Sequence, residues 1–353
     1  MKVLGIETSC DETAASVVQD GRILLSNVIN SQIDIHAVYG GVVPEVAARS
    51  HIEVINPVIN QALTDANLTW DDIDAIAVTY APGLVGSLLI GTLAARTLAV
   101  LKNKPLYPIH HIEAHVYANF LNEKVPEFPI LALIVSGGHS QLVLFRNHGD
   151  FDILGQTQDD AVGEAFDKVA KIIGLTYPGG PSIAKAALNG NPLAYQLPKA
   201  KLSGDYDFSF SGLKTAVLRA VQREVGVDFT FPSTGLAERL NDAQRNDFAA
   251  SFQRVAIETL VEKTVKAFRD YNPKSVVIAG GVAANSELRR ILSENISIQI
   301  DYAPINLCTD NAAMVATLGF YQSRISQPIN PFDLEVNPSL SMTKSNQSEL
   351  SLK

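Results

Sequence analysis

The sequence predicts a two-lobed α/β protein in which the second lobe repeats the plan of the first. Near the start of the chain, three apolar segments separated by the polar turns SCDET and DG are typical of an antiparallel meander, and they span 2–8, 14–19 and 22–27. A second set repeats this pattern at 130–137, 141–145 and 151–157. Each meander is followed later by a strand, a glycine-bearing turn and a helix, at 75–101 and 275–292. This matching order of elements indicates a duplicated fold.

The length of the chain agrees with two lobes. Single hydrophobic cores rarely grow beyond about 250 to 300 residues, and this chain has 353. We therefore expect an N-terminal lobe at 1–125 and a C-terminal lobe with a helical insertion at 126–326. The remaining residues, 327–353, are polar and contain several prolines, which predicts a poorly ordered tail.

Helical spacing of apolar residues predicts the elements between and after the strands. The stretch Leu84 to Leu101 is so apolar that we expect a buried helix. The pattern AVGEAFDKVAKIIG stops at Gly174, and residues 246–271 form the longest amphipathic pattern. The last helix runs through DNAAMVATLGFYQS, where Asp310 is expected as a cap or first-turn residue.

Composition excludes some classes of function. The net charge of −9 and the pI near 5.3 argue against a protein that coats nucleic acid through charge alone. One densely basic set surrounds a predicted helix, although a solvated helix face is the simpler explanation for such a set. It comprises Lys199, Lys201, Lys214, Arg219 and Arg223.

The chain shows no sign of export or membrane insertion. A strand pattern begins at once with MKVLGIETSC, which leaves no room for a signal peptide. The apolar run Leu84 to Leu101 is interrupted by polar residues, so we do not expect it to span a membrane. Two cysteines, Cys10 and Cys308, are too few for a disulfide framework. We therefore expect a cytoplasmic protein.

The stretch HHIEAH, residues 110–115, is the clearest candidate for chemistry. On a helix, His111 and His115 lie one turn apart on the same face and can present two nitrogens to one cation. Zinc-dependent proteases use this spacing, but their glutamate base directly follows the first histidine, whereas Glu113 lies two residues after His111. The sequence therefore lacks the base that a zinc protease needs. A metal site needs a third ligand from elsewhere in the chain, and two surface histidines remain the alternative.

Two small-residue turns follow predicted strands. They are SGGHS, at 136–140, and GGVAAN, at 280–285. Glycine lets the backbone approach a ligand closely and leaves N–H groups free for oxygens, so such turns suit phosphate or nucleoside contact. A single glycine pair usually marks only a tight turn, and the repeated occurrence at strand ends is the better indication.

Taken together, the motifs resemble one family. The segments GIETSCDETAAS, GGVVPEVAARSH, TYAPGLVGSLLIG, HHIEAH, LIVSGGHSQL, FDKVAK, TYPGGP, FSFSGLKTAV, GGVAANSELR and CTDNAAM are similar, in this order, to the catalytic subunit of tRNA threonylcarbamoyltransferase, the TsaD family, formerly labelled O-sialoglycoprotein endopeptidase. The resemblance covers about residues 1–325. It implies the two-lobed fold of actin, sugar kinases and heat-shock ATPases. It also implies transfer of a threonylcarbamoyl group from threonylcarbamoyl-AMP to N6 of adenosine 37 in tRNAs that read ANN codons.

The same resemblance implies a metal centre. Its ligands would be His111, His115 and Asp310, which answers the need for a third ligand with a carboxylate far downstream. Such a set leaves positions open for substrate oxygens, as a catalytic site requires. Fe²⁺ is the metal that the family implies, and Zn²⁺ suits the same ligands. Without a metal, Asp310 would simply be a helix cap.

The resemblance also assigns substrate contacts. The loop that would hold carbamoyl or phosphate oxygens consists of Ile134, Val135, Ser136, Gly137 and Gly138. Asp167 and Gly180 would bind the ribose, and Asn285 the adenine; an exposed helix residue and a helix N-cap are the structural alternatives for Asp167 and Asn285. Glu12 would orient the nucleophile or satisfy its turn. Ala184 stands where many relatives carry an aspartate, which would leave the ribose more dependent on Asp167.

Other functions of the same fold remain to be weighed. The chain could be an ATP-hydrolysing kinase or chaperone-like ATPase, although such enzymes normally hold magnesium through carboxylates, and two histidines suit a softer metal. A nucleotide-binding scaffold without chemistry is the other alternative. The family implies two protein partners, a paralogous dimer partner (TsaB) and a small ATPase (TsaE). The helix at Leu84 to Leu101 could form such a dimer face, or it could be core.

Overall fold

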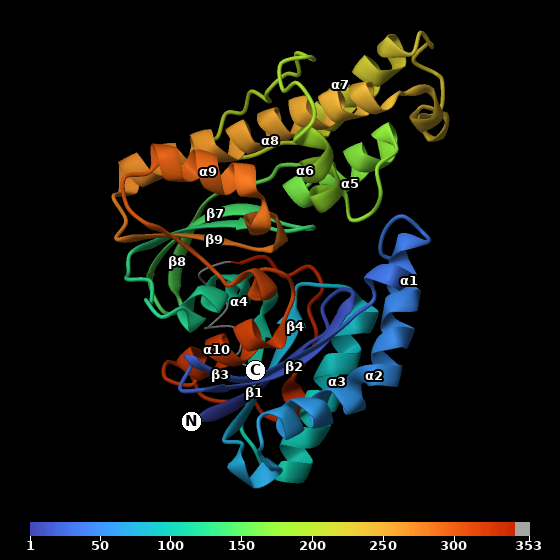
Figure 1. Cartoon of the computed structure of the whole chain (residues 1–353). Coiled ribbons are helices and arrows are strands. Elements are labelled where there is room, and N and C mark those ends of the chain that lie inside the picture. The colour runs from blue at the N-terminus through green and yellow to red at the C-terminus, as the bar shows by residue number, and fades with distance from the viewer. Residues whose placement is uncertain (343–353) are drawn as a thin grey trace.

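A computed structural model of the chain describes residues 1–342 and shows two five-stranded mixed sheets (Figure 1). The first sheet has the order β3-β2-β1-β4-β5. Its strands are β1 Lys2–Glu7, β2 Glu12–Gln19, β3 Ile23–Ser31, β4 Ala75–Ala81 and β5 Leu106–His110. The second sheet has the order β10-β9-β6-β7-β8. Its strands are β6 Ile130–Val135, β7 Ser140–Asn147, β8 Asp150–Gln156, β9 Ser275–Ala279 and β10 Ile300–Tyr302.

The two sheets have the same topology. In each, three consecutive strands pair antiparallel, and the first of them also pairs in parallel with a later strand, β1 with β4 and β6 with β9. A further parallel strand completes one edge, β5 in the first sheet and β10 in the second. The two predicted meanders and the duplicated plan are therefore confirmed. Both β1 and β6 are buried almost throughout, because helices cover both faces of each sheet.

On the outer face of the first sheet lie α2 Pro44–Asp65 and α3 Val85–Lys102 (Figure 1). The predicted burial of α3 is wrong for one of its faces. Leu89, Leu93 and Leu101 are 49%, 61% and 72% exposed, whereas Leu88 on the opposite face is fully buried. Among residues 1–342, α3 is the one helix long and apolar enough to cross a membrane by length and composition. Its packing on β4 and α2 is that of a helix in an α/β lobe.

The last helix, α10 Ala312–Gln322, packs on the inner face of the first sheet although it follows the second sheet in sequence. Two glycines allow this close approach. A Cβ on Gly5 would lie 2.3 Å from the carbonyl oxygen of Ala312, and one on Gly319 would lie 2.5 Å from the Cβ of Ala77. The helix therefore belongs spatially to the N-terminal lobe, which differs from the expected C-terminal lobe at 126–326.

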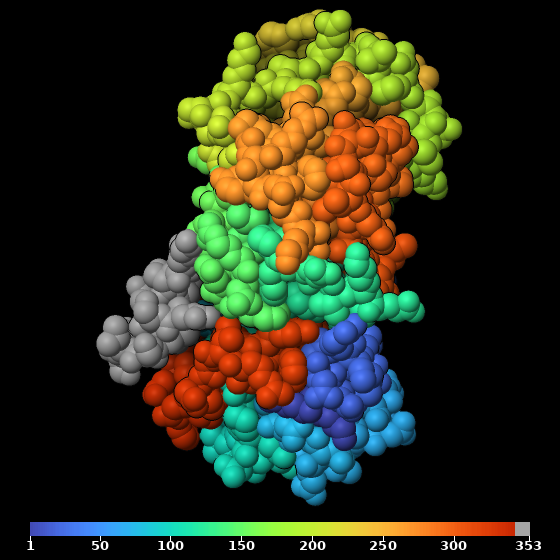
Figure 2. Space-filling model, turned by 90° about the vertical axis from the view of Figure 1, so that its left-hand side faces the viewer, coloured from blue at the N-terminus to red at the C-terminus, as the bar shows by residue number. Residues whose placement is uncertain are grey.

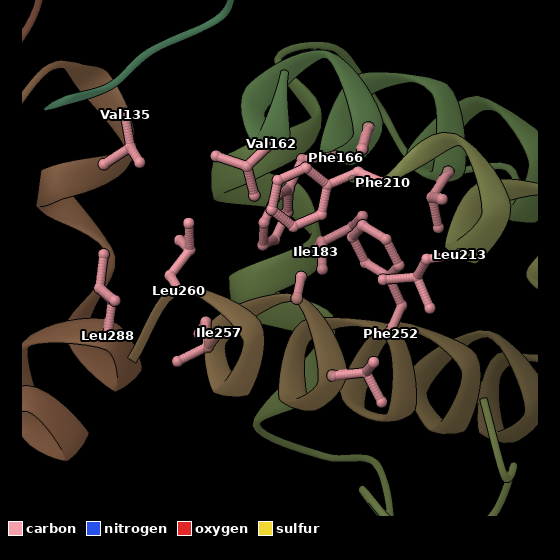
Figure 3. Packing of buried hydrophobic residues seen from close by; sticks show 14 of the residues in the cluster. Val135, Val162, Phe166, Ile183, Phe210, Leu213, Phe252, Ile257, Leu260 and Leu288 are labelled. Atoms are coloured by element: carbon pink, nitrogen blue, oxygen red, sulfur yellow. The ribbon is translucent and has the colours of Figure 1, made fainter. Parts of the chain in front are cut away.

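A layer of helices covers the outer face of the second sheet (Figure 1). It contains α5 Val162–Ile173, α6 Gly179–Ala187, α7 Ser211–Glu224, α8 Asp242–Tyr271 and α9 Ser286–Asn295. Figure 3 shows Phe166 of α5 and Phe252 of α8 within the core between these helices. The helix α8 begins earlier than the predicted 246, because Asn241 caps it and accepts a hydrogen bond from the Gln244 N–H.

Between the two sheets lie α4 His111–Tyr117 and the 3-10 turn η2 Ala118–Leu121. Tyr117 and Phe120 are 1% and 2% exposed, and they belong to an apolar cluster that includes residues of both sheets. One hydrophobic core therefore joins the lobes at their base. Shorter elements complete the fold: α1 Ile33–Ala37, η1 Trp70–Asp72, η3 Ser233–Gly235, η4 Ala237–Arg239, η5 Gly281–Ala284, η6 Ile305–Leu307 and η7 Pro331–Asp333.

The segment 326–342 returns to the N-terminal lobe, and Figure 2 shows red atoms from the late part of the chain beside blue N-terminal residues. The Ile329 N–H donates to Leu106 O at 2.9 Å, and the side chains of Leu334 and Met342 are 2% and 1% exposed. This packing differs from the expectation of a poorly ordered tail as far as residue 342. The rest of that predicted tail, 343–353, lies outside the described residues.

Candidate metal centre and substrate cleft

The predicted metal ligands meet at the junction of the two lobes. β5 ends at His110, and α4 begins at once with His111, so His111 and His115 share one helix face. Asp310 comes from a distant part of the sequence, directly before Asn311. Asn311 is the N-cap of α10, so the prediction that Asp310 caps this helix or lies in its first turn is wrong. One ligand atom from each of the three residues lies within 4.8 Å of the others.

The three candidate ligands converge on one point, at ion-pair distances but without a hydrogen bond between them. His115 Nε2 and His111 Nε2 lie 3.2 and 3.6 Å from Asp310 Oδ1. The side chain of His115 is almost fully buried, yet neither of its nitrogens has a hydrogen-bond partner among residues 1–342. The contact of His115 with Asp310 therefore has the distance of an ion pair but not the direction of a hydrogen bond. A buried orphan imidazole costs about 1–3 kcal/mol, and a cation at the convergence point would satisfy it. The residues fit a divalent metal.

A carboxylate that the sequence analysis missed orients the first ligand. Glu7, at the end of β1, is fully buried, and its Oε2 lies 3.1 Å from His111 Nδ1. The same carboxylate accepts hydrogen bonds from the Ser9 N–H and the Thr79 hydroxyl, both at 2.5 Å. When His111 donates its Nδ1–H to Glu7, its Nε2 lone pair is left for a metal, as in many carboxylate–histidine–metal sites. The sequence did contain a signal for this residue, since Glu7 is a lone acidic side chain at the end of the apolar strand in GIET.

The charges of this group perturb one another strongly. Burial alone would lower the pKa of His111, but the carboxylates of Asp310 and Glu7 outweigh it and raise that pKa to about 9. Conversely, burial would raise the pKa of Asp310, but the facing His111 and His115 hold it well below its usual range. The pKa of Glu7 is likewise lowered, because its contact with His111 outweighs burial. Such mutual shifts are typical of functional clusters.

Glu12 is the first residue of β2, near enough to Asp310 to feel its charge. Burial, followed by the negative charges of Asp310 and Asp11, raises the pKa of Glu12 to about 10. The Ser31 hydroxyl donates to Glu12 Oε1 at 3.2 Å. Glu12 is thus electrostatically coupled to the candidate ligand Asp310, while part of its side chain reaches the surface.

The predicted substrate loop opens toward the cleft. Ile134 and Val135 end the buried strand β6, and the turn that follows is closed by a hydrogen bond from the Ser136 N–H to His139 O at 2.9 Å. At Gly137 and Gly138, an added Cβ would meet no atom within 4 Å. The backbone N–H groups of these two glycines make no hydrogen bond to any other residue in the described part of the chain. The turn can therefore offer two donors to an oxygen-rich ligand.

The other predicted substrate residues lie across the C-terminal lobe. Asp167 Oδ1 accepts a hydrogen bond from the Gly179 N–H at 2.6 Å, and burial raises its pKa, so Asp167 is not the exposed helix residue of the alternative explanation. Gly180, at the start of α6, faces open space. Asn285 is the N-cap of α9, and its Nδ2 donates to Gln253 Oε1 at 2.9 Å. The structure thus gives Asn285 the capping role, whatever further contact it makes.

Two members of the basic set expected around α7, Lys199 and Lys214, pair with carboxylates of the chain. Lys199 pairs with Glu258 and Glu262. Lys214 pairs with Asp160 at 2.7 Å, and Arg219 donates to the Phe229 carbonyl at 2.8 Å. These partners support the simpler explanation of a solvated surface. The paired Lys199 and Lys214 therefore offer little free positive charge to a nucleic acid.

A hollow of about 440 Å³ lies beside the glycine turn. Its lining comes from both lobes and from the C-terminal segment: Pro82, Gly83, Ile112, Gly138, His139, Ser140, Gln141, Gln156, Thr157, Pro338, Ser339, Leu340 and Ser341. Burial lowers the pKa of His139 to about 4, so this imidazole is neutral near pH 7. The sequence analysis assigned no individual site role to His139 or Gln141, and it expected the C-terminal segment to be a poorly ordered tail.

Comparison with known proteins identifies the family. A family model described as "TsaD: tRNA N6-adenosine threonylcarbamoyltransferase" matches residues 23–317. A relative from Dehalococcoides mccartyi is 51% identical over 343 residues, which cover 97% of this chain and 100% of the relative. The chain belongs to the tRNA N6-adenosine threonylcarbamoyltransferase family. Relatives of the same description from Symbiobacterium thermophilum and Thermomicrobium roseum are each 52% identical and cover 96% and 91% of this chain.

Solved structures agree on the fold. Full-length HypF in a phosphate- and nucleotide-bound form has a TM-score of 0.57 at 12% identity, over 92% of this chain and 46% of that chain. HypF from T. kodakarensis has a TM-score of 0.56 at 13% identity, over 92% of this chain and 48% of that chain. The protein therefore has the duplicated two-lobed fold of the actin, sugar-kinase and heat-shock ATPase class. By its family it is an enzyme of tRNA threonylcarbamoylation, which is favoured over a kinase, an ATPase or a scaffold.

Proposed function

We propose that this chain transfers the threonylcarbamoyl group of threonylcarbamoyl-AMP to N6 of adenosine 37 in tRNAs that read ANN codons, releasing AMP. The observation that carries the proposal is the convergence of His111, His115 and Asp310 beside a glycine turn with free N–H groups. Family membership supports the reaction, and this convergence supports the place proposed for it.

The reaction joins N6 of the acceptor adenine to the carbamoyl carbon and breaks the bond from that carbon to a phosphate oxygen. AMP leaves with the bonding electron pair, and one proton leaves N6. The exocyclic amine is a weak nucleophile because its lone pair is delocalised into the ring, whereas the donor is an activated mixed anhydride. The enzyme therefore works mainly by positioning the reactants and stabilising charge.

Negative charge develops on the carbamoyl oxygen during transfer. The N–H groups of Gly137 and Gly138 are free to receive it, since they have no acceptor within residues 1–342. Gly163 of α5 packs directly against this turn, and only glycine fits there, because a Cβ would lie 2.5 Å from Ser136 O. Close packing of α5 against the turn therefore supports a preorganised oxyanion site.

The metal that the family implies would be held by His111, His115 and Asp310. When bound, such a cation supplies Lewis-acid polarisation of a donor oxygen. Glu7 would keep His111 in the tautomer that presents Nε2, and its bonds to Ser9 and Thr79 would keep Glu7 itself oriented. We propose Fe²⁺ as the native metal, with Zn²⁺ as the cation that the same ligands also accept.

We infer that the AMP half of the donor lies against the C-terminal lobe, with Asp167 and Gly180 at the ribose and Asn285 at the adenine. The open space at Gly180 and the partial burial of Asp167 support this placement. Glu12 would act at the opposite wall of the cleft, where it is coupled to Asp310. Ala184 in α6 offers no side-chain oxygen, so Asp167 would carry the ribose contact.

We infer that this chain works in the cytoplasm with a paralogous subunit (TsaB) and a small ATPase (TsaE). The exposed apolar face of α3 supports a protein partner, because Leu89, Leu93 and Leu101 would otherwise remain in water. The pairing of Lys199 and Lys214 with carboxylates supports the idea that partners contribute positive charge for tRNA. Replacing Leu93 by Asp should abolish co-elution with the paralogous subunit. Retained co-elution would refute α3 as that interface.

The direct test supplies purified protein, with and without the partner subunits, with synthetic threonylcarbamoyl-AMP and an unmodified tRNA transcript. Mass spectrometry of the digested tRNA should detect threonylcarbamoyladenosine. His111→Ala and Asp310→Ala should abolish it in folded protein, and His148→Gln, in the turn between β7 and β8 outside the candidate centre, serves as the control. Transfer at the wild-type rate by folded His111→Ala would refute the proposed centre. No transfer in any mixture would refute the function.

A further inference from the structure

The hollow of about 440 Å³ lies next to the candidate centre and is distinct from the expected AMP site. Ile112, which forms one wall, directly follows the ligand His111 on α4. Gly138, which forms another, belongs to the turn proposed to hold the carbamoyl oxygen. Its volume is in the range of about 300–1,000 Å³ that small-molecule pockets occupy. A ligand in this hollow would therefore reach the reacting centre from outside the AMP site.

The lining of the hollow carries no formal charge. None of the described residues that line it is Lys, Arg, Asp or Glu. The lining therefore offers no cationic side chain to a buried phosphate or carboxylate, whose desolvation is unfavourable. The threonyl part of the donor carries a carboxylate, so it does not suit this lining. A neutral ligand does, and the apolar surfaces of Pro82, Ile112 and Leu340 suit a flat ring.

One polar side chain in the lining lacks a partner. Gln141, near the start of β7, is 5% exposed, and its Oε1 makes no hydrogen bond within residues 1–342. Its Nε2 makes only a long contact of 3.5 Å, to Gln156 Oε1. An unmade hydrogen bond at a buried acceptor is destabilising, so the geometry favours a ligand that donates to Oε1. A glutamine amide matches adenine well, because it accepts from the N6 amine and donates to an adjacent ring nitrogen.

We propose that this pocket receives the acceptor adenine of the tRNA, turned out of its loop, and that Gln141 determines specificity by bonding the adenine edge that carries N6. The inference rests on the proposed function. An enzyme that reacts with a base must extract it from the stack and hold it in a shaped pocket. One N6 hydrogen would bond Gln141, while the amine faces the carbamoyl carbon between Gly138 and the metal ligands.

The C-terminal segment forms one side of the pocket. The Asn337 N–H donates to Tyr80 O at 3.0 Å, and Pro338 O accepts from the Gly83 N–H at 3.1 Å. His110 Nε2 lies 3.2 Å from Leu340 O. These bonds tie the segment to the loop after β4, so that Pro338 and Leu340 face the same hollow as Gln141. The ordered packing of this polar segment is thereby explained as a wall of the acceptor pocket.

The test compares Gln141→Leu and Gln141→Asn with the wild type in the transfer assay, using transcripts with adenosine at the acceptor position. We expect the KM for tRNA to rise, or kcat to fall, about tenfold or more in Gln141→Leu. The affinity for AMP, measured by calorimetry, should change less than twofold. A transcript with fluorescent 2-aminopurine at the acceptor position should brighten on binding wild-type protein and respond less with Gln141→Leu.

A second variant keeps the proposal testable if Gln141 variants fail to fold. A chain that ends at residue 336 should show the same tRNA-specific defect, and a chain that ends at 342 is the matched control that retains the wall. Unchanged tRNA kinetics in both variants, or a selective loss of AMP affinity, would overturn the acceptor pocket while the transferase function stands. If the wild type transfers nothing, the proposed transferase function is refuted. This result differs from a refuted acceptor pocket, in which the wild type still transfers.

Discussion

The contact of the buried Glu7 carboxylate with the candidate ligand His111 leads to a specific prediction for Glu7→Gln. Glu7 receives three hydrogen bonds: Oε1 accepts from the Ser9 N–H, and Oε2 accepts from the Thr79 hydroxyl and faces His111 Nδ1. Glutamine has the same shape but only one oxygen. If that oxygen faces Ser9, the amide NH₂ faces His111 and forces the tautomer with its proton on Nε2. If it faces His111, two donors, the NH₂ and the Ser9 N–H, meet in a buried site.

Either outcome has a predictable size. The wrong tautomer leaves His111 unable to offer Nε2, and loss of such a supporting group typically costs about 10–100-fold in metal affinity or activity, about 1.4–2.7 kcal/mol. The opposed donors would instead cost about 1–3 kcal/mol of folding stability through unmet hydrogen bonds. Because Glu7 is fully buried, solvent cannot relieve either conflict. We therefore expect a loss in metal affinity, in stability, or in both.

The assay is competition for Zn²⁺ against a chromophoric chelator, with unfolding by denaturant measured on metal-free protein. Thr79→Val is the matched control, because it removes one donor to Glu7 without changing the tautomer of His111. It should lose about 1 kcal/mol of stability and keep its metal affinity within about twofold. If Glu7→Gln retains both wild-type metal affinity and wild-type stability, Glu7 does not orient His111.

Three further outcomes follow from packing and titration. Gly5→Ala should lower the free energy of unfolding by about 1–3 kcal/mol, because its Cβ would meet Ala312 O at 2.3 Å. The clash would displace α10 together with Asp310, so Zn²⁺ binding should weaken as well. Gly212→Ala is the control and should have neither effect, since a Cβ there meets no atom within 4 Å. Gly163→Ala should slow transfer with metal affinity intact, since its Cβ would push on Ser136 O; an unchanged rate would count against the oxyanion turn. Burial lowers the pKa of His51 in the folded protein, so as the pH falls this histidine is protonated in the unfolded chain before it is protonated in the folded one. The free energy of unfolding should therefore fall as the pH drops below about 6.5. His51→Gln should make this fall shallower by up to about 1.4 kcal/mol per pH unit in denaturant titrations, and an unchanged slope would contradict the assignment.

Much of the fold could be read from local patterns. The alternation of the meanders and the glycine turns predicted two copies of one plan, and the spacing in HHIEAH predicted two imidazoles on one helix face. Motif order predicted Asp310 as the distant third ligand, and the structure places it beside both histidines. These features depend on short stretches of chain, where periodicity and turn chemistry act directly.

Other features could not be read this way. The exposed face of α3 and the packed segment up to residue 342 both differ from expectation, because burial depends on what lies opposite and not on the apolarity of the stretch itself. Nor did local pattern separate Asp310 from the cap of α10, where the neighbouring Asn311 takes that role. Adjacent Asp and Asn are both good caps, so backbone geometry had to decide.

The sequence by itself determined the duplicated two-lobed fold, the family and the three ligands of the candidate metal centre, because strand alternation, helical spacing and motif order are all local or linear properties. Only the tertiary structure decided that Glu7 orients His111, that α10 crosses back to the first sheet, and that Gln141 and the C-terminal segment enclose an uncharged hollow. These contacts join residues far apart in the chain. Their existence depends on how closely two backbones approach, which no single stretch of sequence records.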